Sequence, residues 1–224
     1  MKIIGHRGAK GLSSENTLSS INKALHHHVD LVELDLRVTK DDQVILHHDK
    51  FLKLENGKRY LIKDYPLAKL MEIKPDLISL TSALNKISKD TRFILEVKPR
   101  EDTALIAATI KKLVPSGWHE HSFIIGSKSQ NSLRQLDKLL PGSKMAIIEP
   151  WFGLRAYLRA KELKSNLIVM NQRNIWYGLI KASRFAGLEL YAYTLNNPRK
   201  AKLWQKWGLS GVITDFPDLY EQSK

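Results

Sequence analysis

The sequence predicts a single (β/α)8 TIM barrel, an α/β fold in which eight parallel strands alternate with helices. Three observations lead to this fold. Eight short apolar runs are separated by amphipathic stretches of helical period. The length of 224 residues suits one barrel, which typically needs about 250 residues. Polar and acidic residues follow the apolar runs, at the strand ends where barrel enzymes carry their active sites. We therefore expect residues 1–224 to form one domain.

The expected elements follow the apolar periodicity along the chain. The strands are predicted at residues 3–5, 31–38, 92–97, 122–126, 144–148, 167–170, 188–193 and 211–214. The helices are predicted at residues 15–27, 82–89, 103–114, 129–139, 152–163, 175–185 and 198–207, with a last short helix after Pro217. Ser13 or Ser14 is expected to cap the first helix, and Pro198 suits the first turn of a late one. Gly117, Gly187 and Gly208 follow expected helix ends.

One segment departs from this alternation after the second strand. A polar turn at residues 39–42 leads into a further apolar run at residues 43–46, which indicates a hairpin. Residues from about 50 to 80 then form an insertion that we expect to be irregular and polar. An insertion at this place leaves the barrel at the carboxyl ends of the strands, so it is expected to lie over the active site.

The composition limits the chemistry and the partners. The chain has no Cys, which excludes disulfides and thiolate chemistry and leaves oxygen or imidazole ligands for any metal. No stretch approaches the roughly 20 apolar residues of a membrane span, so we expect a soluble, cytoplasmic protein. The net charge is +13, which indicates either an anionic partner or simply a basic surface.

Two predicted strands carry acids on one face. Because side chains alternate with period two, Glu33, Asp35 and Arg37 share a face, and Glu96 and Lys98 share a face of the next barrel strand. In a barrel these faces line the interior, where unpaired carboxylates are costly. A divalent cation would resolve that cost, because hard cations prefer carboxylate oxygen. The alternative is that the acids face water or pair with Arg37 and Lys98.

Histidines stand beside these acids in the sequence. His6 follows the first strand, and His48 precedes Asp49 at the end of the expected hairpin strand. Two imidazoles near a bound anion can act as general base and general acid. A single His is more often structural, and only one of His47 and His48 can face the site, because their parity differs. Parity alone does not select between them.

Several motifs in the sequence resemble those of the glycerophosphodiester phosphodiesterases over nearly the whole chain. They are His6-Arg7-Gly8-Ala9 with Glu15-Asn16-Thr17, Glu33-Leu34-Asp35, Thr39-Lys40-Asp41 with His48-Asp49, Leu95-Glu96-Val97-Lys98-Pro99, Tyr193-Thr194-Leu195-Asn196, and Gly211-Val212-Ile213-Thr214-Asp215-Phe216-Pro217. Each fragment is weak alone, but their order and spacing are specific. The sequence departs from the family pattern at Ser14, Tyr193 and Ser210, and Tyr193 could change the shape of the alcohol pocket.

The resemblance implies roles for particular residues. A divalent metal, Mg²⁺ or Ca²⁺, would be held by Glu33, Asp35 and Glu96. The acid–base pair would be His6 and His48, so the resemblance selects His48 over His47. The phosphate would be held by Arg7 and Lys98, with Glu15 close by.

The implied reaction is hydrolysis of a small-molecule glycerophosphodiester to glycerol 3-phosphate and an alcohol. The attacking group would be the glycerol 2-hydroxyl, through a cyclic phosphate, or water directly. His6 is assigned as base and His48 as acid.

Two other functions fit parts of the sequence. The first is a lysophospholipase D, with the basic surface favouring transient contact with anionic membranes. In that case apolar residues of the insertion would contact acyl chains: Phe51, Leu52, Leu54, Tyr60, Leu61 and Tyr65. Their alternative role, which we favour, is the core of a lid. The second function is polyanion binding without catalysis, but no nucleic-acid-binding motif is present, so no nucleic-acid partner is expected.

Overall fold

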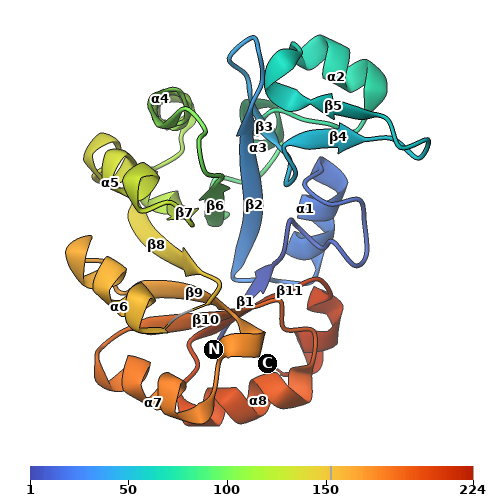
Figure 1. The fold of residues 1–224 in the computed structure, drawn as a ribbon. Helices are drawn as coiled ribbons and strands as arrows, with labels where there is room; N and C mark the ends of the chain where they lie inside the picture. The colour runs from blue at the N-terminus through green and yellow to red at the C-terminus, as the bar shows by residue number, and fades with distance from the viewer. Residues whose placement is uncertain (152, 224) are drawn as a thin grey trace.

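The computed structural model of the protein describes residues 1–151 and 153–223 and contains a closed barrel of eight parallel strands (Figure 1). The strands are β1 (Lys2–Gly5), β2 (Leu31–Val38), β6 (Phe93–Val97), β7 (Phe123–Ser127), β8 (Lys144–Glu149), β9 (Leu167–Asn171), β10 (Glu189–Tyr193) and β11 (Gly211–Thr214). The ring closes because β1 pairs with both β2 and β11. The predicted fold class is confirmed.

Helices connect consecutive barrel strands and cover the outside of the ring. They are α1 (Leu18–His26), α3 (Leu80–Leu84), α4 (Thr103–Leu113), α5 (Gln130–Leu139), α6 (Gly153–Glu162), α7 (Tyr177–Phe185) and α8 (Pro198–Trp207), and the 3-10 helix η5 (Pro217–Ser223) follows β11. Short 3-10 turns also occur at η2 (Val114–Ser116), η3 (Glu120–Ser122) and η4 (Gln172–Asn174).

Several helix starts differ from the sequence prediction, and at α1 and α3 the capping residue explains the difference. Thr17, and not Ser13 or Ser14, caps α1, because its hydroxyl accepts the Ser20 amide while the Ser20 side chain bonds back to the Thr17 amide. The helix predicted at residues 82–89 instead forms α3, because the Ser79 hydroxyl accepts the Ser82 amide and starts the helix earlier. The predicted start at Phe152 lies outside the described residues, and α6 is described from Gly153.

The strand parity divides the core into two apolar layers. Val32, Leu34 and Leu36 of β2 point outward and pack with the surrounding helices. The inward layer fills the barrel with residues of successive strands: Ile4, Leu31, Ile94, Ile124, Ala146, Ile148, Leu167, Val169, Tyr191 and Ile213. This filled interior leaves the polar inward residues of β2 and β6 at the carboxyl ends of the strands, at the mouth of the barrel.

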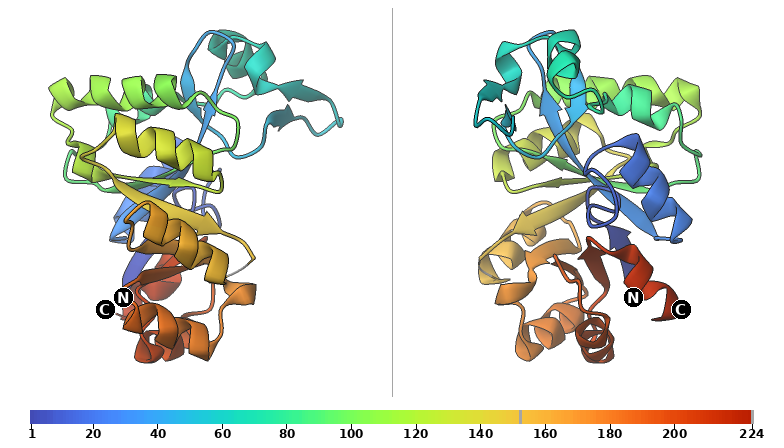
Figure 2. Two further views of the ribbon diagram at one scale, coloured as in Figure 1. Left: turned by 60° about the vertical axis from the view of Figure 1, so that its left-hand side comes forward. Right: turned by 90° about the vertical axis from the view of Figure 1, so that its right-hand side faces the viewer.

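The insertion after β2 is a folded unit with its own core. The predicted hairpin strand is present as β3 (Val44–Leu46), antiparallel to β2. The unit continues through β4 (Phe51–Lys53), β5 (Arg59–Leu61), η1 (Ile62–Asp64) and α2 (Leu67–Ile73), which lie together at one corner of the molecule (Figures 1 and 2). Its buried residues are Ile45, Leu52, Ile62, Leu70 and Leu77.

The expectation of an irregular segment was wrong, because these apolar residues are too widely spaced to indicate an element but converge once the hairpin forms.

Ser14, where the family pattern has Pro, ties the insertion to the barrel through a 2.7 Å hydrogen bond to Asp76. Among the described residues, no helix is both long and apolar enough to cross a membrane.

Candidate active site

Three carboxylates meet at the barrel mouth. Glu33 and Asp35 point inward from β2, and Glu96 points inward from β6, with Asp35 and Glu96 in register across the two strands. One oxygen of each carboxylate lies within 4.8 Å of one oxygen of the other two, and all three residues are buried. Parity therefore brings these acids together as the sequence predicts. Three buried carboxylates at this spacing form a donor set suited to a hard divalent cation.

The electrostatics of this cluster are unequal. Burial, together with the negative charges of Asp35 and Glu96, raises the pKa of Glu33 well above its ordinary value. Burial would also raise the pKa of Asp35, but the neighbouring Lys98 and Arg7 hold that pKa well below its ordinary value. The Lys98 ammonium pairs with Asp35 and, at 2.8 Å, with Glu96. The alternative in which Lys98 pairs with the acids is therefore partly correct, because Lys98 neutralises part of the negative charge of Asp35 and Glu96. The negative charge of Glu33 is not neutralised to the same extent.

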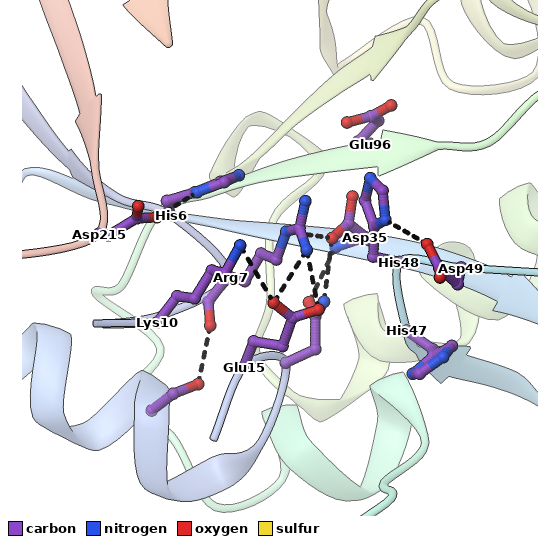
Figure 3. Close-up of polar contacts among 12 residues, drawn as sticks. His6, Arg7, Lys10, Glu15, Asp35, His47, His48, Asp49, Glu96 and Asp215 are labelled. Carbon is purple, nitrogen blue, oxygen red and sulfur yellow. Dashed lines mark hydrogen bonds and ion pairs between the residues drawn. The ribbon is translucent and has the colours of Figure 1, made fainter. Parts of the chain in front are cut away.

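The turn after β1 aims Arg7 into the site. Arg7 has a φ of 51°, and its amide donates to Glu33 at 2.9 Å. Its guanidinium pairs with both oxygens of Glu15 and, through Nε, with Asp35 at 3.1 Å (Figure 3). The following Gly8 has a φ of 82°, and a Cβ there would lie 2.3 Å from the Ser20 hydroxyl. Only glycine fits this turn, which fixes the position of Arg7.

Asn16 orients one of the acids, and its role was not anticipated. Its side-chain amide donates to Asp35 at 2.9 Å, and its carbonyl oxygen accepts the Asp35 amide at 3.1 Å. Asn16 is buried and has a φ of 57°, a left-handed conformation that Asn tolerates better than most residues. The sequence offered one signal, the position of Asn16 inside the Glu15-Asn16-Thr17 motif, but its partner could not be read from spacing.

His6 belongs to a chain of hydrogen bonds that joins the first and last barrel strands. Its Nδ1 lies 2.6 Å from an oxygen of Asp215, which follows β11, and the other Asp215 oxygen accepts the Asn196 amide at 2.9 Å. Burial would raise the pKa of Asp215, but the hydrogen bonds from His6 and Asn196 outweigh it and lower that pKa. Asp215 therefore stays ionised and fixes the orientation of the His6 ring.

His48, and not His47, faces the acids. The His48 ring lies beside Asp35 in Figure 3, and its Nδ1 is 2.9 Å from Asp49, whereas His47 points away and contacts the Phe51 carbonyl oxygen. Burial lowers the pKa of His48 below its ordinary value, although the Asp35 carboxylate acts in the opposite direction. The neutral imidazole is therefore favoured in the absence of further negative charge.

Arg37 holds the His48 backbone in place. It was a candidate partner for the acids, but its guanidinium donates to the His48 carbonyl oxygen at 2.9 and 3.2 Å and to Glu101 at 2.8 Å. The alternative in which Arg37 neutralises the inward acids is therefore excluded, because its guanidinium is bound to Glu101 and to the His48 backbone. Its contacts fix the chain that presents His48.

Two cavities meet at the Arg7 and His48 side chains. The first, of about 170 Å³, is the barrel mouth itself and is bounded by His6, Glu33, Glu96, Lys128 and Tyr193, among others. The second, of about 440 Å³, lies between the site and the insertion and is partly apolar, with Phe51, Leu52 and Leu54 in its wall. One cavity can therefore take a small anionic group, and the other has room for a larger substituent.

The polar strand ends do not all converge. Asn171 and Thr194 line the mouth, but Glu149 points outward and pairs with the buried Arg159 of α6 at 3.1 Å. Sequence reasoning missed Lys128, which follows β7 and lies 3.2 Å from Glu96. A strand-end Lys outside any quoted motif gave no signal in the sequence.

The fold is that of a TIM-barrel enzyme, and clustered carboxylates, cationic side chains and two imidazoles meet at the barrel mouth, where such enzymes carry their active sites. The chain belongs to the glycerophosphoryl diester phosphodiesterase family, whose sequence model matches residues 6–219.

Individual relatives agree with this membership. The chain is 28% identical to the glycerophosphodiester phosphodiesterase of Bacillus subtilis, over 99% of this chain and 85% of that protein. It is 24% identical to the human lysophospholipase D GDPD1, over 96% of this chain and 83% of that protein. Among solved structures, an Oleispira antarctica phosphodiesterase in complex with the product sn-glycerol-3-phosphate superposes with a TM-score of 0.87 at 22% identity, covering 100% of this chain and 96% of that one.

Proposed function

We propose that the protein is a metal-dependent hydrolase that converts glycerophosphodiesters to glycerol 3-phosphate and an alcohol. One observation carries the proposal: two of the three clustered carboxylates, the Arg7 guanidinium and two imidazoles line one cavity at the barrel mouth, and Asp35 and Lys98 contact these side chains. Membership of the phosphodiesterase family supports the reaction class. The small polar cavity suits a glycerol phosphate, and the adjoining larger cavity suits the alcohol part.

The proposed cation ligands are Glu33, Asp35 and Glu96. Their oxygens fit a hard ion such as Mg²⁺ or Ca²⁺, and the raised pKa of Glu33 indicates a carboxylate that is short of positive charge. When bound, such a cation supplies Lewis-acid stabilisation of a phosphate oxygen.

The phosphate contacts are assigned to Arg7 and Lys98. Both cations are held rigidly by acids, Arg7 by Glu15 and Asp35, and Lys98 by Asp35 and Glu96. Preorganised charges of this kind stabilise the negative charge that grows on the nonbridging oxygens without reorganising during the reaction. Glu15 acts through Arg7, whose guanidinium it grips with both oxygens.

The proton transfers are assigned to His6 and His48. His6, oriented by Asp215, takes the proton of the attacking hydroxyl, which is either the glycerol 2-hydroxyl or water. His48 then protonates the departing alkoxide. On the 2-hydroxyl route this leaves a cyclic phosphate, which water then opens to glycerol 3-phosphate. A bound phosphodiester brings negative charge close to His48 and would raise its otherwise lowered pKa, which favours the protonated ring needed for this step.

The decisive assay measures glycerol 3-phosphate release from a panel of glycerophosphodiesters, including glycerophosphocholine, with and without metal. Removal of the metal with EDTA should stop turnover, and adding back Mg²⁺ or Ca²⁺ should restore it, because the ion offsets transition-state charge. Unchanged turnover after metal analysis confirms removal would contradict the cation site. Absence of turnover with any member of the panel in either metal would contradict the assigned reaction.

Asn16→Gly is expected to weaken metal affinity by about 10–100-fold, the usual effect of losing a partner that orients a ligand. Glycine keeps the left-handed backbone but removes both hydrogen bonds to Asp35. Titration calorimetry of Mg²⁺ or Ca²⁺ would measure the change, with Ser13→Gly in the same loop as the control. Wild-type metal affinity in Asn16→Gly would show that Asn16 does not position Asp35.

A lysophospholipase D activity is the second candidate. It is favoured by the apolar wall of the larger cavity, where Phe51, Leu52 and Leu54 stand next to His48, and by the similarity to human lysophospholipase D GDPD1. Turnover of lysophosphatidylcholine compared with glycerophosphocholine separates the two substrates. A higher kcat/KM for the lysophospholipid would make lipid the preferred substrate.

A further inference from the structure

Exposed apolar side chains gather on the outer faces of α6 and α7 and on the loops before them. They are Trp151, Leu154, Tyr157, Leu158, Trp176 and Phe185, named here the α6–α7 surface. Trp151 and Trp176 are each 66% exposed, and Phe185 is 96% exposed. Soluble proteins rarely expose apolar residues in such a group without a partner. This surface lies on α6 and α7, away from the insertion, whose apolar residues form a core of their own (Figure 1).

The surface is hollowed. Between α6 and α7 runs an apolar groove of about 440 Å³, with Leu154 and Tyr157 on one wall, Leu179 and Phe185 on the other, and Met170 at its floor. A groove with apolar walls and floor suits an aliphatic chain.

The charge around this surface is strongly positive. Between Trp151 and Thr214 the acidic residues are Glu162, which pairs with Arg134, and Glu189, which pairs with Lys2 and Lys144. The basic residues of the same stretch are Arg155, Arg159, Lys161, Lys164, Arg173, Lys181, Arg184, Arg199, Lys200, Lys202 and Lys206. Aromatic and aliphatic side chains bordered by cations are the composition of surfaces that bind anionic lipid, because the apolar groups enter the interface while the cations meet the headgroups.

The α6–α7 surface also adjoins the barrel mouth. The loops that carry Trp151 and Trp176 follow β8 and β9 at their carboxyl ends, and the Asn174 side chain joins the two loops by donating to the Pro150 carbonyl oxygen at 2.5 Å. Asn171, five residues before Trp176, lines the mouth cavity. A membrane touching these loops would therefore lie beside the entrance to the active site.

We propose that the α6–α7 surface docks the protein on an anionic lipid bilayer. A second copy of the chain fits less well, because self-association through this face would bring two basic surfaces together. A nucleic acid fits less well, because the groove lining is almost entirely apolar and offers few polar groups to a base edge or a sugar. The docking does not depend on which phosphodiester is hydrolysed.

Sedimentation with vesicles tests the docking of the 224-residue chain. Vesicles of phosphatidylglycerol and phosphatidylcholine should bind it, vesicles of phosphatidylcholine alone should bind it weakly, and salt should weaken the binding. The fluorescence of the exposed Trp151 and Trp176 should shift to the blue on binding, and the shift should disappear in the Trp151→Phe, Trp176→Phe double variant. Equal binding to both vesicle types, or none to either, would overturn the proposal.

Matched variants locate the contact. Leu154→Gln with Phe185→Gln should weaken binding by roughly tenfold or more, because both side chains would leave an apolar phase. Met71→Gln, an exposed apolar residue of the insertion, should leave binding unchanged. Lys161→Glu with Lys181→Glu should weaken binding by roughly tenfold or more, whereas Lys111→Glu with Lys112→Glu on α4 should have a smaller effect.

A failure of the proposed docking can be told apart from a failure of the proposed hydrolase activity. Turnover of water-soluble glycerophosphocholine should be unchanged in the Leu154→Gln, Phe185→Gln variant, which also shows that the variant folds. Wild-type vesicle binding by this variant would overturn the docking, as would a concentration-dependent dimer that the same variant abolishes.

Discussion

Glu33→Gln is expected to reduce the turnover of glycerophosphocholine by at least about 10²-fold without destabilising the metal-free fold. The amide keeps the size of the side chain and can still accept the hydrogen bond from the Arg7 amide. It cannot supply the negative charge that a divalent cation prefers. Loss of a residue that only orients a metal ligand already costs about 10–100-fold in metal affinity. Glu33 is proposed as a metal ligand itself, so its loss should cost at least as much.

The stability outcome follows from the pKa of Glu33, which burial and the neighbouring acids raise. A carboxyl whose pKa is higher in the folded than in the unfolded state favours folding only when protonated, and this contribution is lost as the pH rises through the folded pKa. At neutral pH the Glu33 carboxylate therefore opposes folding. The neutral amide of Glu33→Gln removes this destabilisation. Thermal unfolding of Glu33→Gln in EDTA should occur at the wild-type temperature or above it.

Asp35→Asn provides the contrast to Glu33→Gln. The lowered pKa of Asp35 means that its charge stabilises the fold at neutral pH, because it neutralises Lys98 and Arg7. This variant should lose both turnover and thermal stability. Wild-type turnover in Glu33→Gln would contradict the cation site, and a lowered unfolding temperature in EDTA would contradict the charge repulsion inferred at Glu33.

His6→Ala and His48→Ala should each lower kcat/KM for glycerophosphocholine by at least about 10²-fold, the usual contribution of a general acid or base. The two variants should differ when the leaving group changes. A glycerophosphodiester of p-nitrophenol releases an anion that needs no proton, so this substrate should restore much of the activity of His48→Ala but little of that of His6→Ala. Steady-state kinetics with both substrates measures the difference.

His47→Ala is the matched control for this comparison, because it removes the neighbouring imidazole, which points away from the acids. It should reduce activity by less than about tenfold. Equal losses of activity in His47→Ala and His48→Ala would show that the loss comes from disturbing the loop that carries both residues, and not from removing a catalytic imidazole. Rescue of His6→Ala in place of His48→Ala by the p-nitrophenyl substrate would reverse the assignment of acid and base.

The sequence predicted the barrel and the inward acids because both depend on simple periods. Alternation with period two places Glu33 and Asp35 on one face of β2, and the same parity places Glu96 on the inward face of β6, in register with Asp35. The boundaries of β2 and β11 were predicted to the residue, since apolar runs bounded by polar turns leave little freedom.

Other parts of the site could not be read from periodicity. The contact of Asn16 with Asp35 depends on a left-handed turn, and that of Lys128 with Glu96 depends on a loop, so neither follows a repeat. Parity separated His47 from His48 but could not say which faces inward, because that depends on how β3 pairs with β2. The core of the insertion was hidden for the same reason, as its apolar residues meet only through the tertiary fold.

The hydrogen bond between His6 and Asp215 spans 209 positions of the chain, from the turn after β1 to the turn after β11. A nascent polypeptide that has not yet emerged as far as Asp215 holds His6 without its orienting carboxylate and β1 without one of its two neighbours. Full catalytic power should therefore arise only after Asp215 and β11 have joined the fold and closed the ring. The time at which hydrolysis appears during refolding should therefore report barrel closure. This time is measured separately from helix formation, which circular dichroism follows.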